Sequence, residues 1–390
     1  RKPGPHFIAI TDSRTPLDRL AREREFRRIF LAPTDVGGRY SALSVFGLVP
    51  AALIGVNTRE VLDRAWRMVE SCAFCVEETK NPGLILGAAL GELALAGRDK
   101  LTFLTPSTLT PLQSWIEQLI AESIGKNNKG ILPVVNEVAW PEDSYGADRL
   151  FVSIDIGEAK NSDLHARVAS LLAAGHPVIE FNLPEMVDLG GEFFRWEIGV
   201  AAAGAILGIH PFNQPDVQLA KDFTRKAINQ ESKGEDKSSK ATEPILISED
   251  TLTSSSVSSW LAGAKEGNYF SLHAYLAPTQ QITECLEAIR RALGSRTGLA
   301  VTSGYGPRLL HSTGQLHKGG PNNGLYLQIL GELDEDVAVP ETNYTFGKLI
   351  NAQALGDFKA LTKRGRKILR VNLGKDVIGG LKHLAKVVCG

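Results

Sequence analysis

Apolar residues along this chain alternate between short runs typical of buried strands and longer segments with helical spacing. A strand-like run at His6 to Thr11 precedes a charged amphipathic segment, Thr15 to Arg28, and a second short run at Ile29 to Leu31. A strand, a helix and a strand with short connections are typical of a parallel α/β sheet. The same order recurs between Leu150 and Phe181. The first half of the chain is therefore predicted to be an α/β fold with helices on both faces of parallel sheets.

The segment between residues 188 and 207 is apolar on all sides, which predicts an enclosed helix. Gly208 is its expected stop signal. A second helix is predicted to begin at Pro215, and it places Gln214 and Lys221 about two turns apart. This corner suits an anion or a sugar, although a structural corner with a surface lysine is the commoner reason for such a pattern.

Residues 229–242 are charged and serine-rich and lack apolar periodicity. This pattern predicts a flexible linker at residues 229–246. Beyond the linker, the predicted order is strand, helix, strand, strand, helix, strand, helix. The first six elements match the order of a ferredoxin-like unit. We therefore expect two α/β subdomains, the linker and a C-terminal α+β ferredoxin-like region, with bounds at residues 1–103, 104–228, 229–246 and 247–390.

The composition narrows the class of function. A chain of 390 residues with 43% hydrophobic residues can bury several cores. Its 43 basic and 44 acidic residues nearly cancel, so neither a nucleic-acid nor a membrane partner is expected. Four cysteines in so long a chain predict no disulfide framework, which favours a reducing, cytoplasmic setting. No cluster of side chains predicts a metal or an organic cofactor.

The stretch from Gly37 to Ser41 places two glycines before an apolar segment. Such a pair permits a tight backbone turn, and many strand-to-helix turns need one. The full string G-G-R-Y-S-x-L-S-x-x-G-L is more specific, because it resembles a signature of glucose-6-phosphate isomerases. The resemblance implies that Gly38 binds substrate and that Arg39 stabilises the oxygen on which negative charge develops.

The corner after Gly208 is similar to the lysine-bearing signature of the same isomerases, in which a functional lysine follows a glutamine by seven residues. Gln214 and Lys221 hold these two positions. His210 and Asn213 stand where the family more often has asparagine and aspartate. The resemblance implies substrate binding by Gln214 and a catalytic role for Lys221.

A buried-strand pattern from Ile131 to Val135 ends just before Glu137. Ligands bind at this end of parallel strands, but a lone glutamate there is more often a solvated loop carboxylate. The string K-G-I-x-P-V-V-x-E resembles the strand that carries the catalytic glutamate of the isomerases. The flanking residues differ, because Asn136 and Val138 replace the usual glycine and proline.

A long polar loop, residues 304–321, joins two strands of the C-terminal region. It resembles the isomerase part of bifunctional transaldolase/glucose-6-phosphate isomerase fusions. Either His311 or His317 is a candidate for assisting sugar ring opening. We favour His311 because its His-Ser pair resembles the family's histidine motif, and phosphate-binding or structural roles stay open for both.

Together these resemblances imply sugar isomerase (SIS) type subdomains and interconversion of glucose 6-phosphate and fructose 6-phosphate, a step of glycolysis and gluconeogenesis. Glu137 would move a proton between neighbouring carbons while Arg39 stabilises the enediolate. Lys221 and His311 would open the sugar ring. The partners implied are a sugar phosphate and an upstream transaldolase domain in a longer chain; a homo-oligomer stays open. No cofactor is required.

Only five residues precede the strand at His6, whereas the family places a Ser/Thr-rich phosphate loop there. We therefore expect a longer natural protein and poor sugar-phosphate binding by this chain alone. The alternative is a non-catalytic regulator that binds sugar phosphates on the same fold. The altered flanks of Glu137 favour it, but retention of Glu137 with Arg39, Gln214 and Lys221 opposes it, because a binder needs no base.

Overall fold

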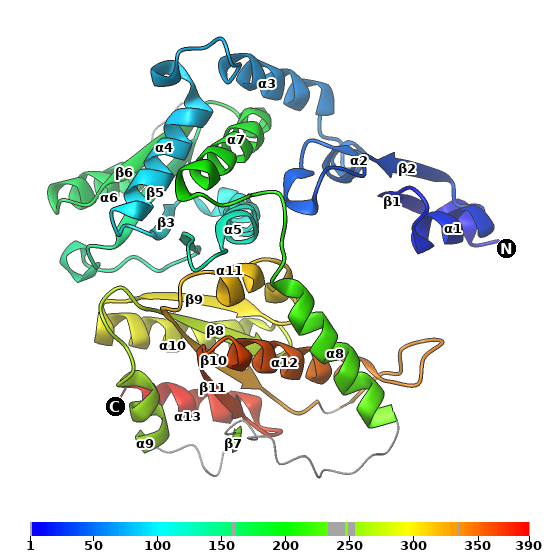
Figure 1. Ribbon diagram of the computed structural model, residues 1–390, viewed down its shortest axis with the longest axis vertical. Helices are drawn as coiled ribbons and strands as arrows, with labels where there is room; N and C mark the ends of the chain where they lie inside the picture. Colours follow the sequence, from blue (N-terminus) through cyan, green and yellow to red (C-terminus); the bar gives the residue numbers. More distant parts are fainter. Residues whose placement is uncertain (1, 158–160, 233–245, 249–253, 334, 390) are drawn as a thin grey trace. The chain divides into compact units, whose positions relative to one another are not determined.

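The computed structural model describes two compact units (Figure 1). The described residues are 2–157, 161–232, 246–248, 254–333 and 335–389. The first unit comprises Arg1–Glu92, Ile154–Asn161 and Phe181–Phe212, and the second comprises Leu93–Ser153, Ser162–Glu180 and Asn213–Gly390. None of the helices in these described ranges is long and apolar enough to cross a membrane.

The first unit begins with the predicted strand, helix and strand. Strands β1 (Ile8–Asp12) and β2 (Arg28–Ala32) pair in parallel, and α1 (Pro16–Glu23) connects them. The Thr15 hydroxyl accepts the amide N–H of Asp18, which caps the helix at its predicted start. The remaining helices of this unit are α2 (Val45–Leu53), α3 (Thr58–Ser71), α4 (Pro82–Leu95) and α7 (Leu189–Leu207).

Helix α7 is buried on one face only, since Phe193, Phe194, Ile198 and Ile206 are partly buried and Ala205 is exposed, so the predicted enclosure on all sides is not observed. Its Trp196 side chain is fully buried, and the helix ends at Gly208, whose φ of 68° is left-handed. Glycines let the backbones of α4 and α7 approach closely. A Cβ at Gly87 would lie 2.6 Å from the carbonyl oxygen of Gly199, so a larger residue there would force the helices apart.

A four-stranded sheet carries the segment that ends in Glu137. Its order is β4-β3-β5-β6, and β3 pairs in parallel with both β4 and β5. The strands are β3 (Lys100–Leu104), β4 (Leu132–Val134), β5 (Arg149–Ile156) and β6 (Val178–Leu183), with helices α5 (Thr110–Ile124) and α6 (Ser162–Ala173). The parallel pairing confirms the predicted α/β class.

A second sheet, of five strands, forms the C-terminal part of the second unit, and its neighbouring strands all pair in parallel. The order is β7-β11-β10-β8-β9, with bounds β7 (Leu246–Ser248), β8 (Tyr269–Tyr275), β9 (Ala300–Tyr305), β10 (Gly324–Leu330) and β11 (Lys367–Asn372). Its helices are α8 (Val217–Ser232), α9 (Ser254–Leu261), α10 (Gln280–Thr297), α11 (Gly314–Gly319), α12 (Phe346–Lys363) and α13 (Val377–Cys389).

The ferredoxin-like prediction for this region was wrong, because a ferredoxin-like sheet is antiparallel. The deciding feature is the connection from β9 to β10, residues 306–323, which contains α11. A connection of a dozen or more residues allows a crossover to a parallel neighbour. The predicted order had no helix between β9 and β10, so it did not reveal the crossover that α11 makes.

Most of the predicted linker at residues 229–246, namely residues 233–245, lies outside the part of the chain that the structure describes. Its first four residues belong to α8, and its last begins β7. The predicted bounds at residues 103 and 228 stay predictions.

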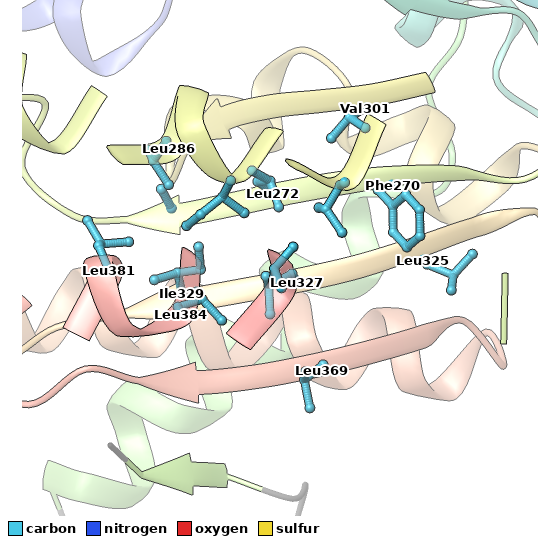
Figure 2. Close-up of a cluster of buried hydrophobic side chains, with 14 of the residues drawn as sticks. Phe270, Leu272, Leu286, Val301, Leu325, Leu327, Ile329, Leu369, Leu381 and Leu384 are labelled. Carbon is cyan, nitrogen blue, oxygen red and sulfur yellow. The ribbon is translucent and has the colours of Figure 1, made fainter. Parts of the chain in front are cut away.

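The five-stranded sheet has one apolar face and one face with polar side chains, and both faces are buried. Phe270 and Leu272 of β8 join Leu325, Leu327 and Ile329 of β10 in a core closed by α10 and α13 (Figure 2). The intervening residues of β8, Ser271 and His273, point to the opposite face with exposures of 2% and 1%. A buried polar face needs internal partners for its polar atoms.

Neighbouring leucines of α6 provide a matched test of this packing. Leu171 is fully buried in the core, whereas Leu172 is 49% exposed. We expect Leu171→Ala to lower the free energy of unfolding by about 2–5 kcal/mol because it leaves a cavity. Leu172→Ala should cost less than about 1 kcal/mol. Urea unfolding of the two variants measures the difference, and equal losses would contradict the assignment of the core.

Candidate functional site

The start of α8 is fixed to the polar loop before β10 by one side chain. The Gln315 amide nitrogen donates to Oδ2 of Asp216 at 2.7 Å and to the Gly125 carbonyl at 3.0 Å. Gln315 Oε1 accepts the Asp216 amide N–H at 2.9 Å, and Arg364 pairs with the other carboxylate oxygen. A Cβ at Gly319 would lie 2.7 Å from the Gln315 nitrogen, so this contact requires glycine there. These bonds set the position of α8 relative to the loop.

Lys221 and His311 consequently line one cavity of about 190 Å³, between α8 and the loop. Arg225 of α8 lines the same cavity one turn after Lys221, together with Lys318 from the loop. Among the described residues that line it, none carries a carboxylate. Partial burial and the nearby Lys221 charge lower the pKa of His311. The arrangement suits an anionic or oxygen-rich ligand.

Lys318 contributes little net charge to this cavity because a buried carboxylate neutralises it. Its Nζ lies 2.6 Å from Oδ1 of Asp357, which is fully buried on α12. Burial by itself would raise the pKa of Asp357, but Lys318 and His273 outweigh burial and hold that pKa well below its usual range. The cationic character of the cavity therefore comes chiefly from Lys221 and Arg225.

Gln214 lies exposed before α8 and is not among the residues lining this cavity. Its neighbour Asn213 is held by Lys126, whose Nζ donates to the Asn213 side-chain oxygen at 2.9 Å. Arg225 was missed by the sequence analysis. Its position four residues after Lys221, on the same face of a predicted helix, was the available signal.

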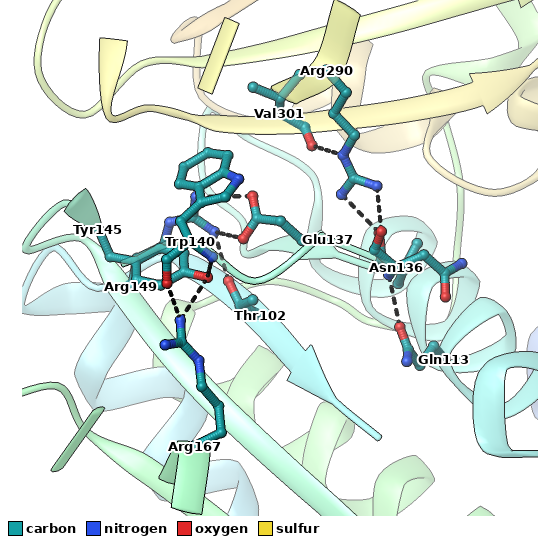
Figure 3. Close-up of polar contacts among 11 residues, drawn as sticks. Thr102, Gln113, Asn136, Glu137, Trp140, Tyr145, Arg149, Arg167, Arg290 and Val301 are labelled. Carbon is teal, nitrogen blue, oxygen red and sulfur yellow. Dashed lines mark hydrogen bonds and ion pairs between the residues drawn. The ribbon is translucent and has the colours of Figure 1, made fainter. Parts of the chain in front are cut away.

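Glu137 forms a bidentate ion pair with Arg149 of β5 (Figure 3). Its Oε2 accepts from Nη1 at 3.0 Å and its Oε1 accepts from Nη2 at 3.1 Å. The side chains of Glu137 and Arg149 are 2% and 0% exposed. The Arg149 guanidinium also lies 5.5 Å and 5.2 Å from the ring centroids of Trp140 and Tyr145. Glu137 is thus held rigidly and shielded from solvent.

The backbone before Glu137 explains the change in its flanking residue. Asn136 has a φ of 51°, in the left-handed region that glycine adopts freely and asparagine tolerates. The Asn136 amide donates to Oε1 of Gln113 at 2.9 Å. Arg290 of α10 donates to the carbonyls of Val135 and Asn136 at 2.8 and 2.7 Å. Asparagine at position 136 is therefore compatible with a left-handed turn, a conformation that glycine adopts freely.

Gly38 and Arg39 belong to the first unit, in the short 3-10 helix Gly38–Tyr40. Arg39 is 3% exposed, and its Nη2 donates to the Pro211 carbonyl at 2.7 Å. The Tyr40 ring lies 5.3 Å from the ring of Phe212. Two motifs from distant parts of the sequence therefore meet within this unit. Glu137, Gln214, Lys221 and His311 all belong to the second unit.

The two candidate histidines lie in different surroundings. His311 lines the cavity of Lys221 and is only partly shielded from solvent, whereas His317 is 1% exposed and stacks on His273 with 4.8 Å between ring centroids. Only His311 lines the cavity of Lys221. The assignment of His311 to ring opening stays a prediction.

The ion pair gives a stability test. We expect Arg149→Met to lower the free energy of unfolding by about 3–5 kcal/mol, because it leaves the Glu137 carboxylate buried without a partner. The double substitution Glu137→Leu/Arg149→Met should cost less than this single one, since no charge then stays buried. Urea unfolding measures both; a double variant less stable than Arg149→Met would show that the pair is not the dominant interaction.

The proximity of Lys221 to His311 gives a titration test. Lys221→Gln should raise the pKa of His311, because a nearby cation disfavours the protonated imidazole. NMR titration of the His311 ring protons measures this shift. Lys226→Gln, an exposed change on the same helix, is the matched control and should leave the pKa of His311 where it is in the parent chain. An unchanged pKa in Lys221→Gln would contradict the geometry.

A scan against protein-family models finds no match. The chain is 28% identical over 255 residues to a glucose-6-phosphate isomerase of Parabacteroides distasonis, covering 55% of this chain and 56% of that protein. It is also 28% identical over 261 residues to one of Rubrobacter xylanophilus, covering 56% and 59%. A solved glucose-6-phosphate isomerase from Chlamydia trachomatis aligns with a TM-score of 0.47 and 18% identity, over 59% of this chain and 53% of that one. The chain is thus similar to glucose-6-phosphate isomerases and spans little more than half the length of the curated relatives it matches.

Proposed function

We propose that this chain belongs to a sugar-phosphate isomerase that interconverts glucose 6-phosphate and fructose 6-phosphate. The observation that carries the proposal is the cavity that brings Lys221 beside His311, with Arg225 on the same wall. Two cations without a carboxylate in the described lining favour a phosphate or sugar oxygen. The similarity to relatives named glucose-6-phosphate isomerase supports the same chemistry.

In this proposal the sugar ring opens between Lys221 and His311. A histidine with a lowered pKa is neutral near pH 7 and can accept a proton, while the lysine ammonium donates one. Glu137 then moves a proton between the neighbouring carbons, and Arg39 stabilises the enediolate oxygen. Gly38 and Gln214 contact the substrate.

The burial of Glu137 adds a requirement to this mechanism. Its side chain is 2% exposed and both carboxylate oxygens contact Arg149. A substrate carbon can reach the carboxylate only after the segment that follows β4 moves. The proposal therefore includes an opening step before proton transfer.

The second candidate function is a non-catalytic regulator that binds a sugar phosphate. The buried bidentate pair of Glu137 and Arg149 favours it, because this geometry is typical of a structural ion pair. A regulator would use the cavity of Lys221 for binding and would leave the ion pair closed.

Glu137→Gln separates the two functions. For the isomerase, we expect kcat for fructose 6-phosphate to fall by about 10²–10⁴-fold while the folded variant still binds the sugar phosphate, because the base is lost and the cavity of Lys221 is unchanged. A coupled assay and calorimetry, on this chain and on the natural protein that carries this sequence, measure both quantities. Glu180→Gln, an exposed change of the same kind, is the control.

Turnover that survives Glu137→Gln would remove Glu137 from the mechanism. Binding of fructose 6-phosphate without turnover in every form, including the unaltered natural protein, would favour the regulator. Absence of both binding and turnover in the natural protein would contradict both candidate functions.

A further inference from the structure

A second cavity, of about 80 Å³, lies in the second unit at the carboxyl ends of β8 and β9. Its lining includes His273 of β8, Thr302 of β9 and Glu117 of α5. The polar loop separates it from the cavity of Lys221, since Ser312 and His317 line the new cavity while their neighbours His311 and Lys318 line the other. We call it the β8–β9 cavity.

Two buried imidazoles at this cavity have ring nitrogens without a hydrogen-bond partner. His273 and His317 are each 1% exposed, and their rings stack at 4.8 Å. Nδ1 of His273 lies 3.4 Å from Oδ2 of Asp357. In the described part of the chain, Nε2 of His273 and both ring nitrogens of His317 have no hydrogen-bond partner. Burying unpaired polar atoms destabilises a fold, so these nitrogens point to an occupant of the cavity.

The lining of the cavity contains both hydrogen-bond donors and hydrogen-bond acceptors. The Asp357 carboxylate beside Nδ1 of His273 holds a proton on that nitrogen, which leaves Nε2 as the nitrogen without a partner. The neutral ring of His317 offers one donor and one acceptor. Hydroxyl groups of Thr302, Ser303 and Thr313 also line the cavity. A ligand hydroxyl is suited to this set because it both donates and accepts.

The charges around the cavity do not favour an anion. Burial lowers the pKa of His317 well below its usual range, and the neighbouring His273 and Lys318 lower it further. Burial raises the pKa of Glu117 to about 7, against the opposing influence of Arg308 and Ser312. With a pKa of about 7, Glu117 is about half ionised at pH 7 and partly offsets the charge of Arg308, and the imidazole of His317 is neutral.

We propose that the β8–β9 cavity binds a small neutral polyol, a compound with hydroxyl groups on three or four consecutive carbons. On the measure by which one water needs about 10–15 Å³, the cavity has room for roughly five to eight atoms of water size. Glycerol and erythritol match this size. The site is separate from the cavity of Lys221 and does not depend on isomerase activity.

Erythritol is the probe for the first test. Titration of the folded chain with erythritol at millimolar concentrations should shift the ring resonances of His273 and His317 in NMR spectra, and the shifts should saturate. Glycerol 3-phosphate should bind no more tightly than glycerol, and inorganic phosphate should not compete with erythritol. A free polyol and the polyol end of a phosphorylated sugar are thereby distinguished.

His317→Phe is the variant for the second test. It keeps a flat ring against His273 and removes both unpaired nitrogens. We expect it to weaken erythritol binding by about tenfold or more, the effect of losing one or two hydrogen bonds from a buried site. His383→Phe, the same chemical change at an exposed position of α13, is the control and should retain the parent affinity.

Thermal unfolding gives an independent readout. Without erythritol, His317→Phe should raise Tm, because two buried unpaired polar atoms are gone. Erythritol should raise Tm of the parent chain more than that of the variant. Since polyols stabilise folded proteins in general at high concentration, the difference between the two proteins is the quantity that matters.

The outcomes decide the proposal either way. Shifts that do not saturate in the parent chain mean that the cavity holds only water, and displacement of erythritol by phosphate means that it is an anion site; each overturns the proposal. If His317→Phe does not fold, Thr302→Val replaces it as a variant of similar shape without the hydroxyl. Parent affinity for erythritol in a folded variant would also overturn the proposal.

Discussion

The pair of hydrogen bonds between Asp216 and Gln315 determines where the chemistry of the second unit lies. These residues are 99 positions apart, and their mutual bonds at 2.7 and 2.9 Å join the first turn of α8 to the polar loop. Lys221 follows Asp216 by little more than one turn, and His311 precedes Gln315 by four residues. This contact helps to hold both elements where the two side chains line one cavity. Gly319 is part of the same constraint, since a Cβ there would collide with the contact.

The sequence predicted most of the elements of the C-terminal sheet but not its polar face. Strand β8 was recognisable from its apolar residues, and Phe270 and Leu272 do lie in the core. The same pattern would suggest that Ser271 and His273 face solvent. They are buried instead, because α12 covers that face and brings Asp357 to His273. The periodicity of apolar residues within one strand does not reveal a partner so distant in sequence. It also does not reveal whether the strand runs parallel or antiparallel to its neighbours.

Candidate site residues were predictable where a motif fixed them and unpredictable where a fold contact did. Lys221 and His311 came from two separate motifs, and the cavity unites them. The ion pair of Glu137 with Arg149 was not predicted, because the sequence around an arginine in a buried strand does not indicate which carboxylate it pairs with. Asn136 illustrates a third case. Its departure from the family looked like altered chemistry, yet its left-handed backbone is a conformation that glycine adopts freely.

In the proposed mechanism, the rigidity of the Glu137 segment is what would separate a catalyst from a binder. Opening that segment breaks two hydrogen bonds from the Arg290 guanidinium, to Val135 and Asn136, before the contact with Arg149 is considered. Hydrogen bonds to charged groups contribute about 1.5–3 kcal/mol each, so these two alone oppose opening by about 3–6 kcal/mol. That free energy corresponds to a loss of about 10²–10⁴-fold in apparent substrate affinity. A substrate whose phosphate and hydroxyl groups offset it can reach the base, whereas a ligand held only by Lys221 and Arg225 leaves the ion pair closed. Catalysis on this fold therefore depends on how much binding energy the substrate gains outside the reacting carbons.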